Sequence, residues 1–294
     1  MAVGKEIRTQ IRSVQNTQKI TAAMEMVAAS KLRRSQERMN SARPYADRIA
    51  QVMRHIAHAQ PEVRSPFLTP RDTAGKVAYL VVTTDRGLCG GLNTNLLRAT
   101  VLHMKEQSEQ GKAIEIAAIG TKAVSFFRRQ GGDVNYVVNG FGELSDPTVL
   151  HGPVAALVNE FERGELDAIY ICRNHFVNTM TQRPEVTPLV PVSAGASEGE
   201  GAAGRIGEYI WDYIYEPDAE TVLNLIIRRY IDSRVYRSVV ENIACEMAAR
   251  MVAMKAASDN AGELINELQL AYNKARQAAI TQEIAEIVGG AAAV

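Results

Sequence analysis

The stretch RRYIDSRVYRSVVENIACEMAARMVAMKAASDNA, Arg228 to Ala261, decides the fold of this 294-residue chain. It contains neither proline nor glycine, and the last proline of the chain, Pro217, precedes it. Between Pro217 and Val288 only Gly262 interrupts the helical pattern. The sequence therefore predicts one helix of roughly 70 residues, on the order of 105 Å long.

Side chains along this helix repeat at spacings of three and four residues, which is the pattern of a coiled-coil seam. The predicted seam consists of Val222, Ile226, Arg229, Ser233, Tyr236, Val239, Ile243, Met247, Arg250, Met254, Ala257, Ala261, Leu264, Leu268, Ala271, Ala275 and Ala278.

The N-terminal segment predicts a second long helix, from about Lys5 to about Ala59 and on the order of 80 Å long, in which Pro44 should introduce a kink or a restart. Its first 27 residues are basic and could be mistaken for an organelle transit peptide. The pattern continues beyond the point where such a peptide would be cut, which favours a structural helix. Its seam consists of Ile7, Ile11, Val14, Gln18, Thr21, Met24, Ala28, Leu32, Ser35, Met39, Ala42, Ile49, Val52 and Ile56.

Two such helices at opposite ends of one chain can bury their seams against each other, which predicts a long antiparallel two-helix coiled coil. The seam is rich in small and polar residues such as Thr21, Ala28 and Ser35, and these bury little apolar area. We therefore expect the pair to be marginally stable alone and to work inside a surrounding partner. A simple rigid spacer is the alternative.

Between the helices the period changes, and strands alternate with helices, which predicts an α/β domain with a doubly wound, mostly parallel sheet. The predicted strands are Lys76–Thr84, Ile114–Ile119, Val134–Val138 and Ala168–Cys172. The predicted helices are Asn95–Gln110, Lys122–Gln130 and Thr148–Arg163.

Two further segments, Val186–Val192 and Tyr209–Tyr215, are predicted edge strands, because prolines at 184, 188 and 191 are tolerated at an edge. Gly195–Gly207 is a predicted flexible loop. The chain then divides into an N-terminal helix (1–60), a central domain (75–208) and a C-terminal helix with its lead-in strand (209–294).

The segment TTDRGLCGGLN, Thr83 to Asn93, follows a predicted strand and raises the question of a phosphate-binding loop. Its glycines form G-x-x-G-G, which matches neither phosphate-binding spacing. Glu109 and Glu115 fall in a polar connection and not at the end of the next strand, so neither is placed to bind a ribose. We interpret the segment as a structural turn in which glycine supplies unusual backbone conformations. Asp85 and Arg86 are interpreted as a turn-stabilising pair, with catalysis as the alternative.

Composition sets wide limits: 46% of residues are hydrophobic, 22% are charged, and the formal net charge is zero. These values are ordinary for a soluble protein, and no apolar run reaches the length of a membrane span. The three cysteines and five histidines match no zinc or disulfide pattern, so we expect no metal and no cofactor. The basic stretch SKLRRSQER, Ser30 to Arg38, suits an acidic protein surface or a nucleic-acid backbone.

Four blocks carry a family resemblance: QNTQKITAAMEMVAASKLRRSQ, YLVVTTDRGLCGGLN, the stretch quoted first, and LQLAYNKARQAAITQEIAEIVGGAAAV at the end. Together they resemble the gamma subunit family of F-type ATP synthases, in its bacterial form. The resemblance covers both helices and most of the centre, and the motif I-T-x-E-x-x-E-x-x-x-G-A from Ile280 to Ala291 is its most specific part.

This resemblance implies a central rotor shaft that is itself non-catalytic and binds no cofactor. The implied partners are the alpha, beta and epsilon subunits and the membrane-embedded c-ring, with no nucleic acid. The shaft would couple ion-driven rotation of the c-ring to the conformational cycle of three beta subunits, for ATP synthesis or hydrolysis. The implied location is the cytoplasmic face of the bacterial inner membrane, as a peripheral protein. The cysteine pair of the chloroplast relatives is missing.

The resemblance also implies contact residues. Arg276, Gln277, Thr281 and Glu283 would form a polar catch against a beta loop, beside buried alanines at 275, 278 and 279. Met24 and Arg250 would lie near the acidic lever of beta, although core packing is an equal alternative for Met24. Tyr213, Tyr215 and Glu216 would face the c-ring and epsilon.

Two other classes of function are open at the level of the residues. A nucleic-acid-binding helical arm would explain the basic stretch and would bind in a salt-sensitive way. A nucleotide-dependent enzyme would explain the central sheet, and the purified chain alone would then bind or turn over nucleotide.

Overall fold

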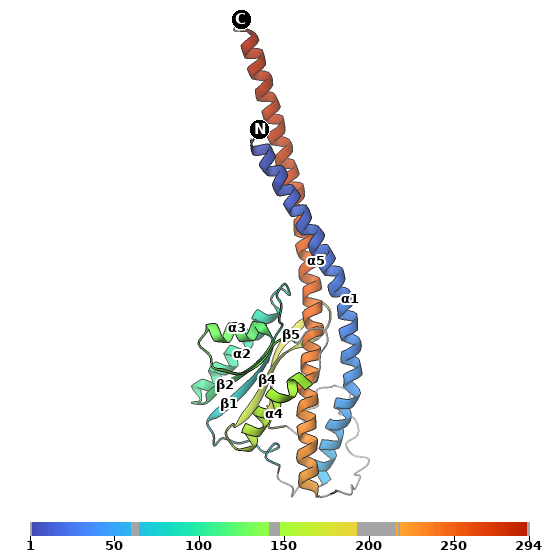
Figure 1. Cartoon of the computed structure of the whole chain (residues 1–294), viewed down its shortest axis with the longest axis vertical. Coiled ribbons are helices and arrows are strands. Elements are labelled where there is room, and N and C mark those ends of the chain that lie inside the picture. The colour runs from blue at the N-terminus through green and yellow to red at the C-terminus, as the bar shows by residue number, and fades with distance from the viewer. Residues whose placement is uncertain (1, 60–64, 141–147, 193–215, 217, 293–294) are drawn as a thin grey trace. The chain divides into compact units, whose positions relative to one another are not determined.

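The computed structural model describes residues 2–59, 65–140, 148–192, 216 and 218–292. The chain forms two compact units, Met1–Ser30 with Arg250–Val294, and Lys31–Ala249. Both units contain part of the two terminal helices, α1 (Ala2–Ala59) and α5 (Ala219–Ala292). Within each unit, Figure 1 shows the two helices packed along each other in opposite directions, as the sequence predicts.

In the first unit, the seam of α1 follows the predicted stripe. Thr21 and Ala28 are buried, and Met254, Ala261 and Ile265 are buried on α5. The two helices approach closely enough for the side-chain amide of Gln18 to donate to the carbonyl of Ser258 over 3.4 Å. Four details of the prediction are wrong: Met24 is 38% exposed, Ala271 and Ala278 are exposed, and Leu264 is exposed while its neighbour Ile265 occupies the seam.

Gly262 lies beside this close approach. A Cβ atom at Gly262 would lie 3.1 Å from Nε2 of Gln18, the mobile end of a flexible side chain. We expect Gly262→Ala to raise the free energy of unfolding by about 0.5–1 kcal/mol, because alanine is the better helix former and Gln18 can move aside. Chemical denaturation measures the change in unfolding free energy. Gly289→Ala, near the end of the same helix, is the control, because a Cβ atom there meets nothing within 4 Å. A lower midpoint for Gly262→Ala would show that Gln18 cannot yield.

The second unit contains the sheet. Its strands are β1 (Lys76–Val82), β2 (Ala113–Ile119), β3 (Val134–Val138), β4 (Ala168–Phe176) and β5 (Gln182–Val190). Within the described residues their order is β3-β2-β1-β4-β5. All neighbours pair in parallel except β5, which runs antiparallel to β4. The predicted doubly wound, mostly parallel sheet is confirmed.

Helices cover both faces of this sheet. On one face, α2 (Leu92–Glu109) and α3 (Thr121–Arg129) pack on alternate residues of β1 and β2. On the other face lie α4 (Thr148–Glu162) and the first turns of α5. The α5 residues in that cluster are Leu223, Ile227, Ile231, Val235 and Val239. The N-terminal part of α5 therefore belongs to the core of the sheet domain as well as to the helix pair.

Because α5 also packs on the sheet, its buried positions differ from the predicted seam. The sequence assigned one stripe to α5, with Arg229 and Ser233 in it, but the most deeply buried positions before residue 240 face the sheet. Further along, Ala244, Met247 and Ala248 pack against Leu32 of α1. The contact of Met247 with Leu32 agrees with the predicted seam, whereas Ala244 and Ala248 were not in it. A helix that contacts a partner on two sides cannot show a single clean stripe.

The predicted edge strand at Val186–Val192 is real, but β5 starts four residues earlier, at Gln182, and ends two residues earlier, at Val190. It lies at the edge of the sheet, where Pro184 and Pro188 remove no needed hydrogen bond. The predicted strand Tyr209–Tyr215 and the predicted loop Gly195–Gly207 lie outside the described residues.

The prediction that Glu115 lies in a polar connection is wrong. It lies within β2 and is only 2% exposed, not in a polar connection. Its carboxylate accepts a hydrogen bond from the side-chain amide of Asn135 at 2.6 Å, and Nζ of Lys76 lies 2.5 Å away. Hydrogen bonding to Glu115 raises the pKa of Lys76. This carboxylate is a structural member of the sheet.

Candidate partner interfaces

The glycine-rich segment lies at the carboxyl end of β1, between β2 and β4. In doubly wound sheets this switch point is where ligands bind. Here protein fills it, because Cys89 and Leu92 pack against Cys245 of α5, with Phe176 beside them. The segment is a packed turn that attaches the sheet to α5.

Side-chain hydrogen bonds hold the turn in place. The side chain of Asn93 accepts from the backbone N–H of Thr84 at 3.2 Å and donates to the Thr84 hydroxyl at 2.7 Å. Asp85 accepts from both the backbone N–H and the hydroxyl of Thr121, at 3.0 and 2.9 Å, and so caps the start of α3. Asp85 therefore has a structural role, but its partner is Thr121 and not Arg86, with which the sequence interpretation had paired it.

The backbone of the turn differs from the expectation in one respect. Gly90 has a positive φ of 57°, but the other left-handed residue is Leu88, with φ 65°, and not Gly87 or Gly91. The side chain of Leu88 is 60% exposed. Gly90 adopts this conformation without a steric cost, so the backbone strain of the turn lies at Leu88.

A buried polar cluster, which the sequence did not predict, joins the β4–β5 hairpin to α5. Arg173 donates to the Glu241 carboxylate at 2.8 Å, and the backbone N–H of Phe176 donates to the other oxygen of that carboxylate at 3.0 Å. Beside them, the amide of Asn174 donates to Asn242 at 2.9 Å. The only sequence signal was the pair of adjacent polar residues, Glu241 and Asn242, inside an apolar helix.

The predicted beta-catch residues lie together near the C-terminal end of α5. Arg276, Gln277, Thr281 and Glu283 are all exposed. Arg276 and Glu283 lie seven residues apart on one side of the helix, and Gln277 and Thr281 four residues apart on the neighbouring side. The alanines beside them are not buried as expected: Ala278 is exposed, and Ala275 and Ala279 are partly exposed.

Met24 belongs to a second exposed group. Ile20, Met24 and Val27 have spacings of four and three on α1, and all three are exposed large apolar side chains. Met24, spaced three and four residues from the buried Thr21 and Ala28, is the least exposed of the three, so contact with beta and core packing both stay open for it. Arg250 is half-buried on α5.

The remaining predicted contacts lie before α5. Glu216 is exposed and precedes Asp218, whose carboxylate caps the helix by accepting from the N–H and hydroxyl of Thr221, both at 2.8 Å. Tyr213 and Tyr215 lie outside the described residues.

Comparison with known proteins decides the family. A family model described as ATP synthase matches residues 4–294. The ATP synthase gamma chain of Nitrosococcus oceani is 55% identical over 294 residues, which is all of both chains. The chain belongs to the ATP synthase gamma chain family. It is therefore a non-catalytic stalk subunit of a multisubunit complex, as the resemblance implied.

Solved structures share the gamma-chain fold at low sequence identity. The rotor of the Euglena gracilis mitochondrial ATP synthase matches with a TM-score of 0.62 and 18% identity, covering 95% of this chain and 99% of that one. A second Euglena structure, of OSCP, F1 and the c-ring, gives a TM-score of 0.66 at 19% identity over 99% and 94%. The central stalk and c-ring of Tetrahymena thermophila gives 0.57 at 22% over 81% and 99%.

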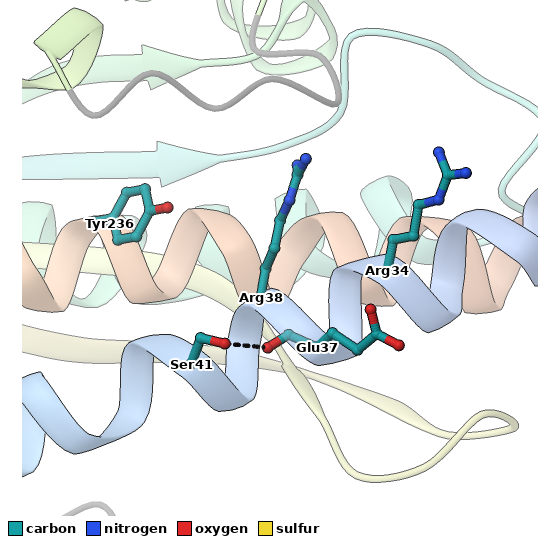
Figure 2. A pocket seen from close by; sticks show the side chains of 5 residues that line it. All are labelled: Arg34, Glu37, Arg38, Ser41 and Tyr236. Atoms are coloured by element: carbon teal, nitrogen blue, oxygen red, sulfur yellow. Dashed lines mark hydrogen bonds between the residues drawn. The ribbon is translucent and has the colours of Figure 1, made fainter.

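The basic stretch of this gamma chain lines a pocket of about 460 Å³, with Tyr236 of α5 on the facing side. Figure 2 shows the side chains of Arg34 and Arg38 extending toward the same side of α1. Glu37 also lines this pocket, and its carboxylate lies 3.4 Å from the guanidinium of Arg33. Two cations one helical turn apart can bind an acidic group of a partner, and the sequence interpretation of this stretch stays a prediction.

Other features of the gamma chain concern metals, thiols and membranes. Burial raises the pKa of the Cys172 thiol to about 12 and also raises that of Cys245, so both stay protonated at neutral pH. The described residues contain no group of three or more potential metal ligands. In the same part of the chain, no helix has the length and apolar character needed to cross a bilayer.

Proposed function

We propose that this gamma chain is the central rotor shaft of a bacterial F-type ATP synthase. It would couple ion-driven rotation of a c-ring to the conformational cycle of three catalytic beta subunits. The observation that carries this proposal is the full-length identity of 55% to a bacterial gamma chain. The solved structures described as a rotor, and as a central stalk with a c-ring, support it at the level of the fold.

Asymmetry supplies the mechanism. A two-helix rod has no threefold axis, so at any angle it presents a different face to each of three equivalent beta subunits. A face that binds one conformation of beta more tightly shifts that subunit toward the favoured conformation. Turning the rod then passes each beta subunit through the same series of conformations, and nucleotide binding and release follow.

The exposed groups on the described helices suit this role. The apolar group Ile20, Met24 and Val27 is available to a surrounding partner, and so are Ile284 and Ile287 on α5. Apolar contacts lack direction and therefore resist turning less than hydrogen bonds do. The polar catch from Arg276 to Glu283 would supply the angle-dependent contacts, with Arg250 nearer the beta lever.

The proposed partners are the alpha, beta and epsilon subunits and the c-ring, and the proposed location is the cytoplasmic face of the bacterial inner membrane. Glu216, together with Tyr213 and Tyr215, would lie on the c-ring and epsilon side. Co-purification with these partners, followed by observation of ATP-driven rotation of a probe attached to this chain, tests the proposal. A chain that bound nucleotide or nucleic acid by itself and formed no such complex would overturn it.

The catch residues give a quantitative test. We expect Arg276→Ala in the assembled complex to lower the rate of ATP-driven rotation on the order of tenfold, because one charge-assisted contact to beta is lost. Nucleotide affinity should stay unchanged. Lys274→Ala, an exposed cation half a turn away, is the control. Equal rates for the two variants would remove Arg276 from the proposed catch.

A further inference from the structure

Torque in a rotor of this kind must pass from the sheet domain to α5. The apolar part of their contact consists of aliphatic side chains, among them Ile231 and Val235, packed against the sheet. Such contacts are strong but non-directional, and cores of this kind tolerate repacking. Apolar packing by itself therefore holds the two parts together without setting a unique angle between them.

The polar cluster at the carboxyl end of β4 is directional. The Glu241 carboxylate accepts from Arg173 and from the N–H of Phe176, and Nδ1 of His175 lies 2.7 Å from it. The second guanidinium nitrogen of Arg173 lies 3.5 Å from Glu185 on β5. Arg173 and Glu241 are each 3% exposed, so water cannot replace these bonds.

The cluster also defines a register. Successive residues of α5, Glu241 and Asn242, meet successive residues of β4, Arg173 and Asn174. Two turns earlier on the same side of α5, Arg234 donates to the carbonyl of Pro188 on β5 at 2.9 Å. A slip of α5 by one residue turns it by about 100° and breaks all of these bonds at once.

We propose that the cluster of Arg173, Glu185 and Glu241 fixes the rotational alignment of the sheet domain on α5, so that torque passes between them without slip. Glu241 is the central positioning residue. This inference rests on the proposed rotor function. Setting a register is the best-attested role of buried polar groups in helical assemblies.

The test separates alignment from stability. Arg173→Met with Glu241→Leu replaces both charges by apolar groups of similar size, so neither charge is left unpaired against the other. The backbone N–H of Phe176 loses its acceptor in this variant. In the assembled, membrane-reconstituted complex we expect the ATPase rate to be retained and the thermal unfolding midpoint to fall modestly, because the Phe176 N–H loses its acceptor. Ions pumped per ATP hydrolysed should fall by about threefold or more, within the range seen when coupling networks are altered.

Two further variants complete the design. Lys76→Met with Glu115→Leu removes a charged pair whose carboxylate is buried within the sheet and which does not involve α5, and pumping should stay at the wild-type ratio. If the Arg173 and Glu241 double variant fails to assemble, Glu241→Gln keeps the shape and weakens the cluster. It should lower the pumping ratio in the same direction.

The outcomes are distinct. A wild-type pumping ratio in an assembled double variant, or in Glu241→Gln where only that variant assembles, overturns the alignment role and leaves the rotor function standing. Absence of ATP-driven pumping in the wild-type complex would instead count against the rotor function itself.

Discussion

Replacing Gly120 by alanine is expected to lower the free energy of unfolding by about 3–5 kcal/mol, enough to unfold the sheet domain. Gly120 has φ 94°, and a Cβ atom there would lie 2.4 Å from the carbonyl oxygen of Thr83. That backbone cannot retreat, because the N–H of Thr83 donates to Ile119 and the N–H of Gly120 donates to Val138, each at 2.8 Å.

The matched control for this prediction is Gly111→Ala. Gly111 has a similar φ of 82°, but a Cβ atom there meets nothing within 4 Å. The control should cost only the backbone strain of about 1–2 kcal/mol. Urea denaturation of the purified chains compares the two variants. Equal losses would show that the close approach to Thr83 contributes nothing beyond backbone strain.

Ala248→Leu is expected to cost about 2–3 kcal/mol and to weaken the pairing of α1 with α5. Ala248 is fully buried between Leu32 of α1 and its own neighbours Ala244 and Met247. The larger side chain must push the helices apart or force unfavourable rotamers. Since leucine and alanine have similar helix propensities, the loss reports packing alone.

For this second prediction, Ala256→Leu, at an exposed site on the same helix, is the control and should leave stability nearly unchanged. Circular dichroism during denaturation measures both variants. Recovery of the assembled complex measures the effect on partner binding. If Ala248→Leu proved as stable as the control, the seam would have to contain unfilled space.

Local patterns predicted most of the fold correctly. The alternation of strand and helix periods gave the elements of the central domain to within a few residues, and the two proline-poor ends gave α1 and α5. These features are local, because apolar periodicity and the positions of proline and glycine depend only on residues that are close together in the sequence.

The errors occurred where a residue meets a partner far away in the sequence. The predicted end of β4 was Cys172, but the strand continues to Phe176. The polar residues Arg173 and Asn174 look like a strand end until their partners on α5 are known. Glu115 was misread for the same reason, because Lys76 and Asn135 make its burial possible.

For the predicted partner-contact residues, too, the sequence supplied one part and the structure another. Arg276, Gln277, Thr281 and Glu283 came from family resemblance, and the structure adds that all four are exposed on one segment of α5. Ile20 and Val27 were passed over because they fell outside the seam, although exposed apolar side chains on a seam helix are the physical mark of a partner surface.

The sequence by itself determined two long helices, a doubly wound sheet between them, and a glycine-rich turn unsuited to phosphate. Each follows from periodicity or spacing within a short window. Only the tertiary structure decided that α5 packs against both α1 and the sheet, and that Glu241 lies buried against Arg173. Whether a polar side chain in a helix is solvated or buried depends on which distant segment packs over it, and no local pattern contains that information.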